Sequence, residues 1–113
     1  MAKEKYIPAR GDIVWTNFDS GAGHEQMGKR PALILSSQSF NKKILLAMAA
    51  PITSRVRGHG FEVPIDVKKI TGVVLCQQVK MIDFNEKGLQ FVEKAPEAVT
   101  NEALARVRAI ISE

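Results

Sequence analysis

Two short segments of this chain hold residue types that could handle a phosphate group. Residues 24–31 read HEQMGKRP, and residues 51–54 read PITS. Pro31 restricts the residue before it to extended backbone, so the guanidinium of Arg30 leaves a stiff strand start. A second proline fixes the backbone two residues before Thr53 in the same way. We therefore predict a planar cation and a hydroxyl group that act together on a phosphate without a metal ion.

Length and composition limit the class of protein. The 113 residues predict a single domain, residues 1–113, with one core. Cys76 is the only cysteine, which excludes an internal disulfide, and with only His24 and His59 it cannot build a zinc site. The first eight residues lack the apolar core of a secretion signal, and no apolar stretch approaches the roughly 20 residues that span a bilayer. We expect a cytoplasmic protein with no cofactor and no membrane association.

The net charge of +4 is distributed unevenly along the chain. No acidic residue lies between Gln26 and Phe61. The cations in that stretch are Lys29, Arg30, Lys42, Lys43, Arg55 and Arg57. Segregation of this kind creates a local positive field that attracts polyanions. The alternative is a lysine-rich surface that is merely solvated, because segregation in sequence is not segregation in space.

The apolar pattern predicts short strands followed by one helix. The predicted strands are 11–18, 31–36, 44–50, 61–65 and 72–82, with a helical turn over 37–41 and loops over 19–29 and 53–60. Segment 44–50 is rich in helix-forming residues, but Pro51 ends it after seven residues, so we interpret it as a central strand. Pro64 indicates that 61–65 is an edge strand. Segment 86–95 receives no assignment, and helical spacing after Pro96 predicts a helix over 97–111.

This order of elements is typical of a mainly β fold. It predicts a small, strongly curved antiparallel sheet or partial barrel with a C-terminal helix. Such a sheet leaves free edges and a face that one helix cannot cover. A homodimer would cover both, and we expect one.

A series of residue blocks resembles the MazF/PemK family, the toxin ribonucleases of bacterial toxin–antitoxin pairs. The resemblance runs from about residue 11 to residue 111. It is carried by GDIVW at 11–15, FD at 18–19, GHEQ at 23–26 with Gly28, Arg30 and Pro31, LS at 35–36, FN at 40–41, PIT at 51–53, FEV at 61–63, GVVL at 72–75 and QV at 78–79. Each block alone is weak, but the ordered series at matching spacing is specific.

The resemblance implies a fold, an activity and a site. The fold is an SH3-like antiparallel barrel that forms homodimers, and the activity is metal-independent cleavage of single-stranded RNA, such as messenger RNA, at short motifs. The family's catalytic arginine falls on Arg30, its threonine on Thr53 and its acidic loop residue on Glu25. Some members carry an aspartate and a second arginine where this chain has Gln77 and Leu75. The implied partner is a cognate antitoxin that places a disordered acidic tail over the RNA groove.

The chemistry that these residues could perform is internal RNA scission. The ribose 2′-hydroxyl attacks the adjacent phosphorus in line and leaves a 2′,3′-cyclic phosphate and a 5′-hydroxyl. Arginine stays charged, so we assign Arg30 to stabilising the phosphoryl oxygens, while Thr53 donates a further hydrogen bond. A carboxylate can accept a proton, which makes Glu25 the candidate base. His24 has a suitable intrinsic pKa, so the choice between the two stays open.

RNA binding needs groups beyond the catalytic set. We expect stacking, edge hydrogen bonds and backbone contacts from Phe18, His24, Gln26, Lys29, Ser54, Arg55, Arg57 and Gln78. Phe61 could stack on a base or belong to the core. His59, between two glycines, is expected only to be exposed.

Two other classes of function compete with a nuclease. A related fold serves CcdB-like toxins that bind a topoisomerase without hydrolysis, and the helix at 97–113 would then carry recognition. A small RNA-binding barrel without catalysis is the third interpretation. At the level of single residues, Thr53 could only cap a turn, and Glu25 could be a loop charge paired with Lys29.

Overall fold

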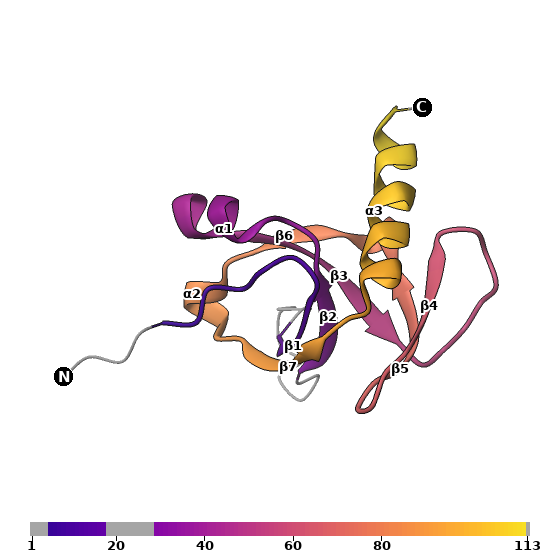
Figure 1. Cartoon of the computed structure of the whole chain (residues 1–113), viewed down its shortest axis with the longest axis horizontal. Coiled ribbons are helices and arrows are strands. Elements are labelled where there is room, and N and C mark those ends of the chain that lie inside the picture. The colour runs from indigo at the N-terminus through magenta and orange to yellow at the C-terminus, as the bar shows by residue number, and fades with distance from the viewer. Residues whose placement is uncertain (1–4, 18–28, 113) are drawn as a thin grey trace, which may run out of the picture.

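The chain folds into a strongly curled antiparallel sheet with a helix at its C-terminal end (Figure 1). The computed structural model describes residues 5–17 and 29–112. In chain order its elements are β1 (Asp12–Thr16), β2 (Arg30–Ile34), α1 (Gln38–Ile44), β3 (Ala47–Thr53), β4 (Glu62–Asp66), β5 (Thr71–Leu75), the 3₁₀ turn η2 (Cys76–Gln78), β6 (Lys80–Ile82), α2 (Phe84–Lys87), β7 (Gln90–Lys94) and α3 (Glu97–Ser112). This architecture confirms the predicted fold class. In the described part of the chain, no helix is both long and apolar enough to cross a bilayer.

Strand β3 lies at the centre of the sheet. The strand order is β4-β5-β3-β2-β1-β7, and β6 pairs with β3 as well. The predicted central strand is therefore confirmed, but its predicted bounds are wrong. It begins at Ala47 because α1 continues to Ile44 and ends at Leu45, whose left-handed backbone closes the helix. It also runs through Pro51, which pairs with Ala32 of β2.

The predicted strand over 72–82 is interrupted by η2. β5 and β6 both pair with β3, at Ile52↔Val74 and at Ala49↔Lys80. Along β3 the two positions, 52 and 49, are three residues apart, whereas their partners, 74 and 80, are six residues apart. The surplus equals the three residues of η2. The turn therefore inserts a short excursion opposite Pro51, where a residue without an N–H can be accommodated.

The ends of the sheet are formed by β4 and β7. The edge position predicted for the strand around Pro64 is confirmed, and that proline is exposed. β7 fills part of the segment that received no assignment, and it pairs with β1. Its sequence, QFVEK, shows no alternation of apolar and polar residues and so carries no strand signal. The C-terminal helix is confirmed as α3.

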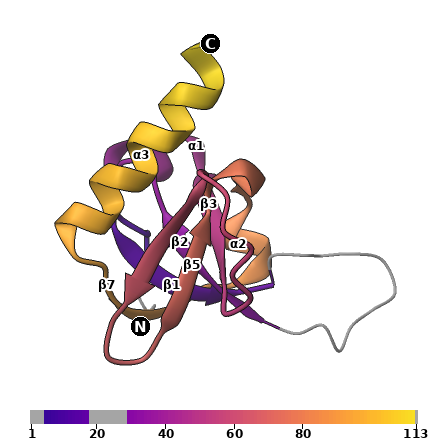
Figure 2. The same cartoon turned by 90° about the vertical axis from the view of Figure 1, so that its right-hand side faces the viewer.

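The apolar side chains form two clusters on opposite faces of the sheet. On one face, Ile13, Leu33 and Val74 pack with Ala103 and Val107 of α3. α3 contacts β4 and η2 (Figure 2). The second cluster gathers side chains from β1, β2, β3 and β6 with Phe84 of α2. The alternation of inward residues along β1 and β2 thus fixes which residues face each cluster.

Candidate active site

Arg30 and Thr53 lie on the wall of one cleft. Arg30 is the first residue of β2 and Thr53 the last residue of β3. The antiparallel pairing Ala32↔Pro51, continued by two residues, brings them opposite each other at the same end of the sheet. Both are half-buried, and both line a cleft of about 410 Å³.

The cleft gathers six of the residues predicted for the site. These are Arg30, Thr53, Ser54, Arg55, Arg57 and Gln78. Leu75 and Gln77 line it too, and neither was among the predicted site residues. Lys29 is exposed beside β2 and does not line the cleft. Four predicted residues, Phe18, His24, Glu25 and Gln26, lie outside the described residues.

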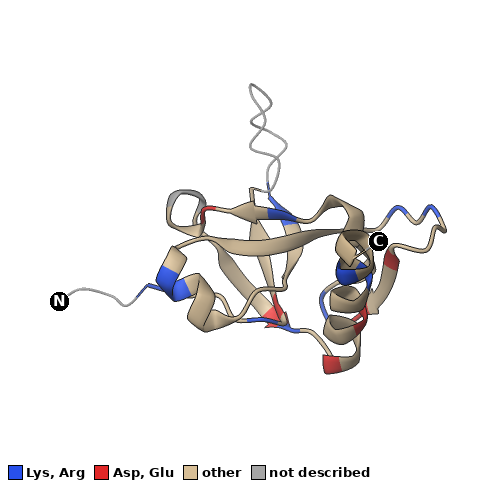
Figure 3. Ribbon diagram, turned by 90° about the horizontal axis from the view of Figure 1, so that it is seen from above, with Lys and Arg blue, Asp and Glu red and all other residues tan. Residues whose placement is uncertain are grey.

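The cleft carries positive charge. Among the described residues that line it, three are arginines and none is a carboxylate. Two of the arginines belong to the loop 54–61 between β3 and β4, which projects from the molecule in Figure 3. Considering the described residues alone, no group of three His, Cys, Asp or Glu side chains is arranged to hold a metal ion.

A second hollow adjoins the first. It has a volume of about 330 Å³ and shares Arg30, Thr53 and Ser54 with the cleft. Its other walls include Trp15 and Lys69. The shared residues therefore form the ridge between the two hollows, that is, the wall that both have in common.

The Thr53 hydroxyl has a fixed oxygen and a proton to donate. Its Oγ1 accepts a hydrogen bond of 3.1 Å from the backbone N–H of Arg55. A hydroxyl that accepts one bond still has its own O–H to give. The turn-capping interpretation and the functional one are therefore compatible.

Gly72 of β5 allows the backbone of Thr53 to come close. A Cβ atom at position 72 would lie 2.2 Å from the carbonyl oxygen of Thr53 and 3.2 Å from the Cα of Ser54. Both of those atoms are backbone and cannot swing aside. Only glycine fits here, and its absence of a side chain sets where the end of β3 lies.

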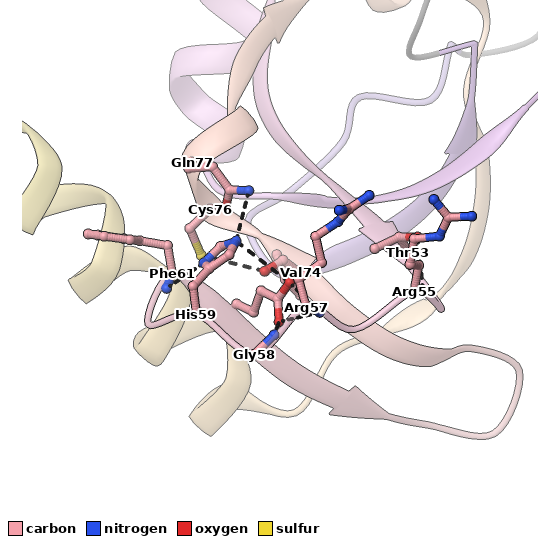
Figure 4. A network of polar contacts seen from close by, with 10 residues as sticks. Thr53, Arg55, Arg57, Gly58, His59, Phe61, Val74, Cys76 and Gln77 are labelled. Atoms are coloured by element: carbon pink, nitrogen blue, oxygen red, sulfur yellow. Dashed lines mark hydrogen bonds and ion pairs between the residues drawn. The ribbon is translucent and has the colours of Figure 1, made fainter.

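Glu62 anchors the loop that carries the arginines. The side chain is buried, and its carboxylate accepts hydrogen bonds from the N–H of Gly58 at 2.7 Å and of Arg57 at 3.0 Å (Figure 4). These two bonds, the Gly58 bond first, and the nearby charge of Arg57 lower the pKa of Glu62, against the opposing effect of burial. The sequence held no signal for this role, because a glutamate at a strand start reads as exposed.

His59 connects Glu62 to Gln77. Its Nδ1 accepts a hydrogen bond of 3.2 Å from the N–H of Phe61. Its Nε2 lies 3.6 Å from Oε2 of Glu62 and 3.3 Å from the side-chain amide nitrogen of Gln77. His59 is therefore exposed as expected, but it also has partners. Phe61 is 37% exposed, and Figure 4 shows its ring pointing away from Thr53, so it neither fills the core nor stacks in the cleft.

Comparisons with known proteins agree with this geometry. Residues 9–111 match the family model described as the PemK-like, MazF-like toxin of type II toxin–antitoxin systems. The chain is 38% identical over 117 residues to the endoribonuclease PemK of Escherichia coli, which covers 99% of this chain and 88% of that protein. Its structure is similar to crystallised MazF from Deinococcus radiodurans, with a TM-score of 0.86, 35% identity and coverage of 96% of this chain and 100% of the other. A MazE–MazF structure from the same organism matches with a TM-score of 0.83, 31% identity and coverage of 96% and 98%.

Proposed function

Since this chain belongs to the PemK-like, MazF-like family of toxins from type II toxin–antitoxin systems, we propose that it is an endoribonuclease acting on single-stranded RNA. Its targets include messenger RNA, cut at short sequence motifs without a metal ion. The observation that carries the proposal is the placement of Arg30 and Thr53 on one arginine-lined cleft. Residues 1–113 act as a single toxin domain.

The proposed reaction is attack of the ribose 2′-hydroxyl on the adjacent phosphorus. The O2′–P bond forms, the P–O5′ bond breaks, and the products carry a 2′,3′-cyclic phosphate and a 5′-hydroxyl. Arg30 stabilises the charge on the phosphoryl oxygens, and Thr53 donates a hydrogen bond to the same group. Glu25 or His24 accepts the 2′-hydroxyl proton, and the departing O5′ takes up one proton from water to become the 5′-hydroxyl, so the step conserves protons.

The remaining predicted residues bind the RNA strand. Arg55 and Arg57 contact the phosphate backbone beside the scissile group, with Ser54 and Gln78 on the same wall. Phe18, His24, Gln26 and Lys29 contribute from the segment that precedes β2. The second hollow extends this surface past the ridge.

The decisive test is cleavage of end-labelled single-stranded RNA in the presence of EDTA, with analysis of the termini. We expect cyclic-phosphate ends from the native protein and loss of cleavage in Arg30→Ala and Thr53→Ala. Arg108→Ala is a matched control, because this arginine lies on α3 outside the cleft, and we expect it to cleave RNA normally. RNA that is bound but left intact would favour a non-catalytic RNA-binding barrel. No RNA interaction together with inhibition of a topoisomerase would favour the CcdB-like alternative.

We propose two protein partners: a second copy of the chain and a cognate antitoxin with an acidic disordered tail, both in the cytoplasm. The homodimer is supported by exposed apolar residues around α1 and β6, with Phe40 40% exposed and Met81 39% exposed beside a hollow of about 380 Å³. Light scattering should give a mass of two chains for the native protein and of one chain for Met81→Asp.

The antitoxin is supported by the MazE–MazF structure above and by the positive cleft, which an acidic tail complements.

A further inference from the structure

We propose that Gln77 selects a nucleobase by presenting its side-chain NH₂ group to the cleft, and that His59 and Glu62 are positioning residues that hold it in this orientation. The inference rests on the proposed function, since it names the recognition partner of the same cleft. Gln77 lines that cleft and comes from the 3₁₀ turn η2.

The hydrogen bonds of His59 determine which way the Gln77 amide faces. Nδ1 of His59 accepts from the N–H of Phe61, so that ring nitrogen carries no proton. The neutral ring therefore carries its proton on Nε2, which is a donor. The atom of Gln77 placed 3.3 Å from Nε2 is the amide nitrogen, and two donors cannot pair. The amide must therefore be turned over, with its oxygen toward the ring, because the oxygen and nitrogen of an amide are assigned from their hydrogen bonds. The NH₂ group then faces away from the ring.

Glu62 holds the ring in this state. Its buried carboxylate lies 3.6 Å from Nε2 of His59, on the side where the proton sits. The same carboxylate fixes the two backbone N–H groups that precede His59, so the backbone that carries the ring is held in place. Figure 4 shows Gln77, His59 and the loop joined in one network on the side of the cleft opposite Arg55.

The chemistry of an amide donor points to a base rather than a phosphate. Three arginines already supply charged donors for phosphate in this cleft. A neutral NH₂ group adds little affinity for an anion, but it discriminates between base edges that present an acceptor and those that present a donor. The proposed ligand is therefore the acceptor edge of one nucleobase beside the cut, such as a carbonyl oxygen or a ring nitrogen.

The test is cleavage of a randomised single-stranded RNA pool, followed by sequencing of the new ends. Gln77→Glu replaces the donor by an acceptor of the same shape. We expect the preference at one nucleotide position beside the cut to fall about tenfold, which corresponds to one net hydrogen bond, while preferences at other positions persist. His59→Ala should weaken the same preference, and His59→Gln, which retains a donor at the ε position, should restore it. Asn101→Asp makes the same charge change on α3 outside the cleft and is the matched control.

Two outcomes would overturn the inference: an unchanged site preference in Gln77→Glu, or an equal loss of cleavage at all sites. If the native protein leaves the pool intact, the proposed nuclease function fails, and the base preference of the RNA that remains bound becomes the readout for Gln77.

Nitrogen chemical shifts of the two histidine rings give an independent check, and the His24→Gln variant identifies which signals belong to His59. A neutral His59 protonated on Nδ1 would contradict the mechanism of orientation.

Discussion

At the residue scale, the site depends on side-chain oxygens that accept hydrogen bonds from backbone N–H groups. The oxygen of Thr53 is held by the N–H of Arg55, and the carboxylate of Glu62 is held by the N–H groups of Arg57 and Gly58. Each contact fixes an atom of the loop relative to the sheet. The loop therefore presents its arginines from a defined position although its side chains are exposed.

Thr53→Val tests the donor role of the hydroxyl. Valine has the same shape but neither donates to a phosphate nor accepts from Arg55, so we expect kcat on a fluorescent RNA to fall by about 10²-fold or more. Thr53→Ser keeps the hydroxyl and should retain most of the rate. Equal rates for the valine and serine variants would show that the hydroxyl does not take part.

The lowered pKa of Glu62 predicts a dependence of stability on pH. The pKa lies below the ordinary value of 4.5 in the folded chain, so the unfolded chain binds a proton first as the pH falls. The stabilisation is therefore complete above pH 4.5 and is lost as the pH falls through the folded value. Urea midpoints measured between about pH 3 and about pH 6 should fall with acidity, and less steeply in Glu62→Gln. Parallel curves for the two proteins would contradict this prediction.

Sequence reasoning reached some site residues and missed others for a physical reason. Arg30 and Thr53 are marked by prolines and by the family blocks around them. Glu62 lies within a family block, and Gln77 stands where some family members carry an aspartate. Neither mark gives a role, because the roles of Glu62, His59 and Gln77 come from contacts between β4, the preceding loop and η2.

At the element scale, the site is formed where β2 begins and β3 ends, beside β5 and η2. The register of β3 with β2 sets Arg30 opposite Thr53, and the register with β5 sets Val73 opposite Thr53. The strand types could be predicted from alternation and turn residues. The interruption by η2 could not, since no glycine or proline marks a turn between residues 73 and 82.

Gly72→Ala tests the contact between β5 and β3. The added Cβ would lie 2.2 Å from the Thr53 carbonyl oxygen, so one strand must move. We expect loss of RNA cleavage together with a lower melting temperature, by a few degrees for about 1 kcal/mol in a domain of this size. Gly60→Ala is the control, because no atom lies within 4 Å of a Cβ at position 60. Unaltered activity in Gly72→Ala would mean that the close approach does not set the position of Thr53.

At the scale of the whole molecule, charge is arranged for a polyanion. The chain has a net charge of +4, and the cleft that holds Arg30 also holds Arg55 and Arg57. The segregation seen along the sequence is therefore partly a segregation in space. Lys42 and Lys43 are the exception, because they lie in the last turn of α1 and do not line the cleft.

Salt dependence measures how many of these charges reach RNA phosphates. The logarithm of the affinity for single-stranded RNA should fall linearly with the logarithm of salt concentration, with a slope of about 0.7 per neutralised phosphate. Arg55→Ala combined with Arg57→Ala should make the slope shallower by about 1.4. Lys42→Ala combined with Lys43→Ala should leave it unchanged. A slope that responds equally to both pairs would indicate non-specific attraction to the whole surface.

The three-residue excursion at η2 has a consequence for how this scaffold can vary. Strands β5 and β6 both face β3 correctly only while the excursion keeps its length, because a deletion of one residue would turn every later side chain of β6 to the opposite face. The identities of Gln77 and Gln78 are under no such constraint, since both are exposed. Libraries that randomise these two positions at fixed length should therefore yield folded proteins, and any search for altered target motifs can begin there.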